Sequence, residues 1–119
     1  MESEQNLTAK LREQAEGAIG LGVAYIGIAN GLFEALDRIG PADSETVAEA
    51  AQVDRDYVRR WCDAAFALGY LDRAGGRFQL TALGAAVRPG VPGTLMPVVV
   101  QSVVSAHMAE RAAGLMRSG

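Results

Sequence analysis

The sequence predicts a mainly α-helical fold with one small β-hairpin. Half of the 119 residues are hydrophobic but only 6% are aromatic, so Ala, Val, Leu and Ile must supply most of the core. Apolar residues recur at helical spacing over most of the chain, and only two short segments have the pattern of strands. A chain of this length buries about two-thirds of its unfolded surface, which is enough for one folded domain.

Residues 1–40 are expected to form helices that make a dimer interface. The first helix is predicted over residues 5–19, which are amphipathic. The second, over residues 21–39, is apolar on most of its circumference and therefore needs cover on most sides. A second copy of the chain can supply that cover. Gly40 and Pro41 end the helix, because proline cannot continue it.

Residues 41–88 have the order of a winged helix-turn-helix. Asp43 and Ser44 are candidate caps for a short helix, and Asp54 caps the next one, over residues 55–68. Two strand candidates, joined by a glycine-containing loop, and one more short helix follow over residues 70–72, 77–80 and 82–87. Two helices joined by a short turn, then a β-ribbon that forms the wing, are typical of this motif.

Residues 89–119 are predicted to be a connector followed by a long helix. The connector, residues 89–93, holds two prolines and two glycines. Thr94 is expected to cap the helix, which runs to about Met116. Its apolar residues spread around the helix, so it also needs cover on several sides.

Charge and cysteine content point to a cytoplasmic protein that does not favour nucleic acid. The formal net charge is −3, whereas proteins that neutralise phosphates are usually basic. The single cysteine, Cys62, excludes an internal disulfide and is expected in the core beside Trp61. The start of the chain lacks a signal-peptide pattern, and two uncharged stretches, residues 17–33 and 89–109, contain too many Gly, Pro and polar residues to indicate a membrane span.

No motif in the chain indicates catalysis. Gly20-Leu21-Gly22 lies between two helical patterns with no strand before it, which favours close helix packing over a cofactor-binding loop. His107 is the only histidine, so metal sites built from several His and Cys side chains are excluded. It is either a hydrogen-bonded structural histidine or a residue that touches a ligand. Nothing marks a nucleophile turn.

Binding to DNA depends on five arginines on the second helix of the motif and on the wing. Nearby aspartates offset them almost one for one, so the face that would meet phosphate carries little net charge. Arginine and aspartate spaced three or four residues apart also fit a solvated helix face. The candidate DNA contacts are Arg55, Arg59, Arg60, Arg73 and Arg77.

Several blocks, taken in series, resemble a known family. The order and spacing of the blocks resemble the N-terminal domain of bacterial class I S-adenosylmethionine-dependent methyltransferases, of the O-methyltransferase type. The match covers about residues 18–88. The blocks are Gly31-Leu32-Phe33-Glu34-Ala35-Leu36, Gly40-Pro41-Ala42, Val47-Ala48-Glu49-Ala50, Asp56-Tyr57-Val58-Arg59-Arg60-Trp61, Leu68-Gly69-Tyr70-Leu71 and Arg77-Phe78-Gln79-Leu80-Thr81.

The resemblance implies a winged-helix dimerisation domain that does not catalyse alone. In that family the last long helix leads into a catalytic domain that binds S-adenosylmethionine, and no such cofactor domain is found before Gly119. The chain is therefore expected to be part of a longer enzyme, and no catalytic, cofactor or metal residues are assigned. The family's pocket for a small-molecule methyl acceptor is partly roofed by this domain, which makes candidates of Tyr25, Gln101, His107 and Met108.

Two other readings keep the same fold. One is a small dimeric winged-helix transcription regulator that binds DNA, for which 119 residues is a suitable length. The other is a module that dimerises or binds a hydrophobic small molecule without chemistry. Whether the chain is part of an enzyme depends on which of these three hypotheses is correct.

Overall fold

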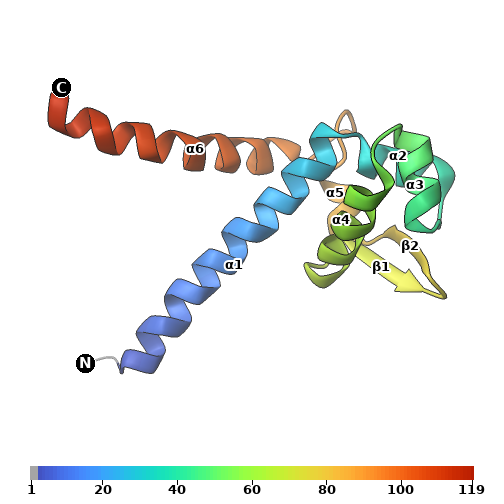
Figure 1. The fold of residues 1–119 in the computed structure, drawn as a ribbon, viewed down its shortest axis with the longest axis horizontal. Coiled ribbons are helices and arrows are strands. Elements are labelled where there is room, and N and C mark those ends of the chain that lie inside the picture. Colours follow the sequence, from blue (N-terminus) through green and yellow to red (C-terminus); the bar gives the residue numbers. More distant parts are fainter. Residues whose placement is uncertain (1–2) are drawn as a thin grey trace.

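The computed structural model describes residues 3–119 as a small winged-helix body from which two long helices project (Figure 1). The body contains the four short and middle-sized helices and one antiparallel hairpin, and the N- and C-terminal helices diverge from it. The elements are α1 Glu4–Ala29, α2 Leu32–Ile39, α3 Ser44–Ala51, α4 Arg55–Ala67, β1 Leu71–Ala74, β2 Arg77–Leu80, α5 Ala82–Ala86 and α6 Met96–Ser118.

The predicted break between the first two helices is at the wrong place. The α1 helix runs without interruption through Gly20 and Gly22, and the break lies instead at Asn30–Gly31, where Gly31 adopts φ +68°. Glycine inside a helix costs only about 1 kcal/mol relative to alanine, which packing at this position can offset. The single apolar face predicted over residues 21–39 is therefore divided between α1 and α2.

The predicted caps of the helix-turn-helix are confirmed. The Asp43 carboxylate accepts a hydrogen bond from the Thr46 backbone N–H at 2.8 Å. Asp54 accepts from the N–H groups of Asp56 and Tyr57, both at 3.0 Å. These bonds satisfy donors that the first turn of each helix would leave unpaired.

The wing is a tighter hairpin than predicted. Gly75 and Gly76, at φ +59° and +77°, form a two-residue turn, which suits the twist of the flanking strands. Residues 73 and 74, expected in the loop, instead pair with Phe78 and Arg77. Ala42 adds a bridge that was not predicted, since its N–H and C=O both bond to the backbone of Phe78.

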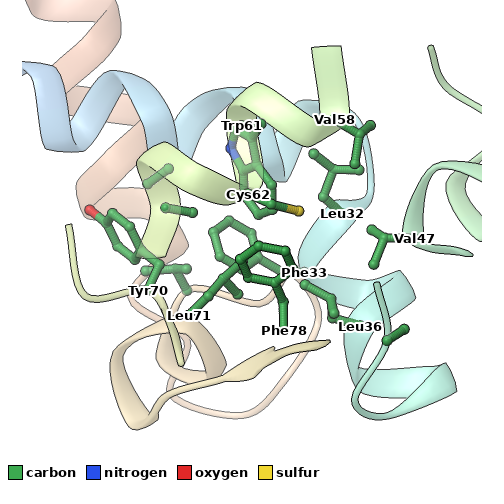
Figure 2. Packing of buried hydrophobic residues seen from close by; sticks show 14 of the residues in the cluster. Leu32, Phe33, Leu36, Val47, Val58, Trp61, Cys62, Tyr70, Leu71 and Phe78 are labelled. Atoms are coloured by element: carbon green, nitrogen blue, oxygen red, sulfur yellow. The ribbon is translucent and has the colours of Figure 1, made fainter. Parts of the chain in front are cut away.

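The core of the body is built around Phe33, which is fully buried (Figure 2). Its ring meets those of Trp61 and Tyr70 edge-on, with centroids 5.3 and 6.0 Å away. Such pairs add about 0.5–1.5 kcal/mol beyond the area they bury. The core is thus more aromatic at its centre than the low aromatic content of the sequence suggests.

The α6 helix begins at Met96, after a connector held by Thr94. The Thr94 hydroxyl donates to the Arg88 carbonyl at 2.6 Å and accepts from the Met96 N–H at 3.1 Å. The Arg88 guanidinium in turn pairs with Asp37 of α2 at 2.8 Å. The predicted N-cap is therefore one residue off: Leu95 occupies the N-cap position of α6 and makes no side-chain cap bond, while Thr94, the residue before it, bonds to the Met96 N–H.

Among residues 3–119, no single helix has the length and hydropathy of a membrane span. Only α1 and α2 taken together, with a 66° bend between them, meet those criteria.

Candidate functional site

The C-terminal part of α1, residues 20–27, is anchored to the body by two side-chain hydrogen bonds. The Tyr70 hydroxyl donates to the Gly20 carbonyl at 3.0 Å, and the Trp61 indole N–H donates to the Val23 carbonyl at 2.8 Å. Gly27 permits this approach, because a Cβ there would lie 2.5 Å from the Trp61 ring and 2.6 Å from the Phe33 ring. Close helix packing was the preferred interpretation of Gly20-Leu21-Gly22, and the buried Gly20 agrees with it.

Outside the anchored part of α1 and the first turns of α6, where Val99 is buried in the core, the two terminal helices are exposed to solvent. Residues 3–19 and 104–119 are exposed throughout. Many of their apolar side chains are half or more exposed, which is unusual for a monomeric protein. On α1 they are Leu7, Leu11, Ile19 and Ile26, and on α6 they are Val98, Val104, Leu115 and Met116.

The exposed apolar face of α1 lies opposite the face that docks on the body. The docking face holds the buried Gly20, Ala24 and Gly27. At 100° per residue, the opposite face carries a line of small and apolar residues separated by alternating steps of four and three. We call this line the outer seam: Leu11, Ala15, Ala18, Gly22, Tyr25 and Ala29.

A pocket opens beside the outer seam where α1 ends. Its volume is about 340 Å³, and its floor is formed by the buried side chains of Leu32, Val58 and Trp61. Ile26 and Tyr57, 50% and 72% exposed, stand at its mouth. We call it the Trp61 pocket, and its lining is completed by Asn30, Val53 and Asp54.

The four predicted acceptor-pocket residues lie on the two projecting helices. Gln101 lines a shallow hollow of about 620 Å³ on α6, and Met108 lies two turns further along the same face. His107 is exposed next to Met108. Tyr25 belongs to the outer seam of α1 and does not line that hollow. Their role in an acceptor pocket stays a prediction.

The predicted DNA-contact arginines lie among acidic and aromatic groups. Arg55 pairs with Glu45 at 3.3 Å, and Arg73 pairs with Asp63 at 3.5 Å. Arg60 lies over the Tyr57 ring, with its guanidinium carbon 5.9 Å from the centroid. These contacts fit the solvated-face interpretation.

The two remaining arginines also have acidic neighbours. Arg59 lines a polar hollow together with Glu45 and Asp56. Arg77 is close enough to Asp43 to lower the pKa of that carboxyl, although hydrogen bonding by Thr46 lowers that pKa more. The described residues therefore present no face on which arginines gather without carboxylates.

The one thiol has no catalytic potential where it lies. Cys62 is fully buried, as predicted, and burial, with a smaller contribution from Asp63, raises its pKa from 9.0 to about 12. A thiol with that pKa stays protonated and is a poor nucleophile at neutral pH. Within residues 3–119, no three His, Cys, Asp or Glu side chains are grouped as metal ligands.

Comparisons with known proteins identify the fold and related structures. Residues 17–76 match the family model described as the Rv2258c-like winged HTH domain. No curated protein sequence matches the chain significantly.

Solved structures match most or nearly all of the chain at low sequence identity. An O-methyltransferase family protein from Burkholderia thailandensis has a TM-score of 0.72 and 21% identity over 98% of this chain and 34% of its own. Human N-acetylserotonin methyltransferase, solved with SAM, has a TM-score of 0.69 and 19% identity over 95% and 36%. A riboflavin-derivative dimethyltransferase from Streptomyces davawensis has a TM-score of 0.66 and 21% identity over 82% and 28%. The chain thus spans about a third of the length of each.

Proposed function

Since the chain belongs to the Rv2258c-like winged HTH domain family, we propose that it is the N-terminal, non-catalytic domain of an S-adenosylmethionine-dependent methyltransferase. The proposal depends on how much of this chain, and how little of each methyltransferase, is covered when the structures are superposed. Between 83% and 98% of this chain superposes on about a third of several methyltransferases, including ones solved with SAM or its demethylated product SAH.

The residues of this chain do not fit the cofactor itself. A cofactor loop of the nucleotide-binding kind needs glycines between a strand and a helix. Here Gly20 and Gly22 lie within α1, and Gly75 and Gly76 form the hairpin turn. S-adenosylmethionine and the chemistry of methyl transfer therefore belong to another part of the parent enzyme.

The domain has two proposed roles in that cytoplasmic enzyme. Residues 1–40 and the α6 helix hold two subunits together as a homodimer. Within them, α1 and α6 carry the apolar side chains that the body leaves exposed, whereas the apolar face of α2 is buried in the body. Residues 89–119 lead toward the catalytic domain. From there the exposed face around Gln101 and Met108 covers part of a pocket for a small-molecule methyl acceptor.

The reading frame beyond Gly119 and cofactor binding test this proposal. We expect the gene to continue into a strand followed by an acidic, glycine-rich loop. Titration calorimetry should detect S-adenosylmethionine binding to the longer product and none to residues 1–119. A stop codon directly after Gly119, or cofactor binding by residues 1–119 alone, would refute the proposal.

A further inference from the structure

The chain exposes more surface than a solitary protein of its size. Its accessible area is 8170 Å², whereas monomers of 12.5 kDa expose about 6,200 Å². The radius of gyration is 16.9 Å, against about 13.5 Å for a compact domain of this length. The excess area, about 2,000 Å² per chain, is as large as the surface that permanent dimers bury.

The outer seam specifies a helix as its partner. Its alternating steps of four and three repeat every seven residues, the spacing with which one helix packs along another. A small-molecule ligand would not need a line of contacts extending from Leu11 to Ala29, which at 1.5 Å per residue is about 27 Å long. The identical seam on a second copy satisfies the requirement, because a two-fold axis pairs a surface with itself.

The sizes of the seam residues favour an antiparallel pair. With the axis at the level of residue 20, Leu11 faces Ala29 of the partner, Ala15 faces Tyr25 and Ala18 faces Gly22, so large residues meet small ones. A parallel pair would instead set Tyr25 on Tyr25 and Gly22 on Gly22. Facing positions of unequal size interdigitate and leave fewer voids.

The antiparallel pair also provides a side chain that can occupy the Trp61 pocket. The Leu11 that faces Ala29 arrives beside Ile26 and Asn30, two residues that line that pocket. Leu11 is 69% exposed on its own chain, and the pocket floor is apolar. In a parallel pair, the pocket of one chain would lie next to the pocket of the other chain. Leu11 would then be far from both pockets, and both would stay empty.

We propose that α1 pairs antiparallel with α1 of a second copy, so that Leu11 of each chain seats at the Trp61 pocket of the other. The inference rests on the homodimer of the proposed function and deepens it by assigning the partner segment, its direction and a receiving pocket.

Disulfide trapping of the full chain tests the direction of pairing. Oxidised with diamide, the double variant Ala15→Cys/Tyr25→Cys should form a covalent dimer, whereas each single variant should not. The double variant Glu13→Cys/Tyr25→Cys is the matched control, because Glu13 lies on the side of α1 away from the seam. The native Cys62 is buried and does not compete.

The outcomes separate this inference from the proposed function. Single variants that cross-link with themselves would show a parallel pair, and a dimer that no seam cysteine traps would show another interface. Either result overturns the antiparallel pair and leaves the homodimer intact. A monomer at all concentrations would overturn both.

Substitution of Leu11 tests whether this side chain occupies the Trp61 pocket of the other chain. Leu11→Ala should raise the dimer dissociation constant at least about 30-fold, since truncating a buried leucine is usually worth that much or more. Leu83→Ala, which removes a 45% exposed leucine outside the seam, should leave the constant unchanged. Equal effects of the two variants would contradict the assignment of Leu11 to the pocket.

Discussion

The winged-helix body and the two projecting helices differ in what covers them. In the body, apolar side chains from α2, α3, α4 and both strands bury one another, and the helix-turn-helix begins each helix with a side-chain cap. The distal parts of α1 and α6 are equally regular but project away from the body and are exposed (Figure 1). A segment can therefore form a regular helix without burying its apolar side chains, and only the elements of the body do both.

The largest expected effect on stability comes from truncating the side chain at the centre of the body's core. Phe33→Ala should lower the free energy of unfolding by about 3–5 kcal/mol, because a large cavity forms among buried rings. Phe66→Ala, at a 44% exposed position on α4, should cost less than about 1 kcal/mol. Urea denaturation measures both, and similar losses would mean that Phe33 does not lie at the centre of the core.

Two glycines of α1 should respond to alanine in opposite directions. Gly27→Ala places a methyl group against Trp61 and Phe33 and should destabilise the protein by about 1–3 kcal/mol. Gly17 has open space around its Cβ position, so Gly17→Ala should stabilise by about 0.5–1 kcal/mol through helix propensity. Thermal unfolding would contradict the account if both variants shifted stability in the same direction.

The sequence predicted the body better than the projecting helices. Caps, turn glycines and the spacing of apolar residues are local signals, and Asp43 and Asp54 both cap their helices as expected. The bridge from Ala42 to Phe78 was missed because it joins residues 36 positions apart, with no local pattern to mark it.

The break of the first helix was misplaced for a related reason. Gly20 and Gly22 resemble a helix end locally, but the Tyr70 hydroxyl, 50 residues away, binds the Gly20 carbonyl and holds the helix against the body. The candidate site was predicted as uncovered apolar surface, which composition can reveal. The Trp61 pocket was not predicted, because its lining comes from two stretches of the chain, residues 26–32 and 53–61, that only the tertiary fold brings together.

Alkaline pH should loosen the body where it holds α1. Burial raises the pKa of Tyr70 above its ordinary value of 10.0 and that of Cys62 from 9.0 to about 12. The folded state then keeps protons that the unfolded chain releases. The contribution of Cys62 is complete below about pH 9 and falls as the pH rises through 9 to 12, by up to about 1.4 kcal/mol per pH unit. Tyr70 acts in the same direction above about pH 10.

The alkaline loss can be assigned by substitution. Cys62→Ala should reduce the slope of unfolding free energy against pH between 9 and 12, whatever its effect on stability at pH 7. An unchanged slope would show that this thiol does not contribute.

The smallest expected effect concerns DNA. Because Arg55 and Arg73 are paired with carboxylates, duplex DNA should bind weakly in a gel-shift titration, and binding should depend little on salt. The double variant Arg59→Ala/Arg77→Ala should change it by less than about threefold. Tight, sequence-selective binding that falls steeply with salt would support the regulator instead.

Sedimentation equilibrium on the chain tests the central claim most directly, namely that a second copy covers the outer seam of α1. The account predicts a species of twice the 12.5 kDa chain mass at micromolar concentration, and dissociation when Leu11 and Tyr25 are replaced by aspartate. A single species of 12.5 kDa across the concentration range would contradict it.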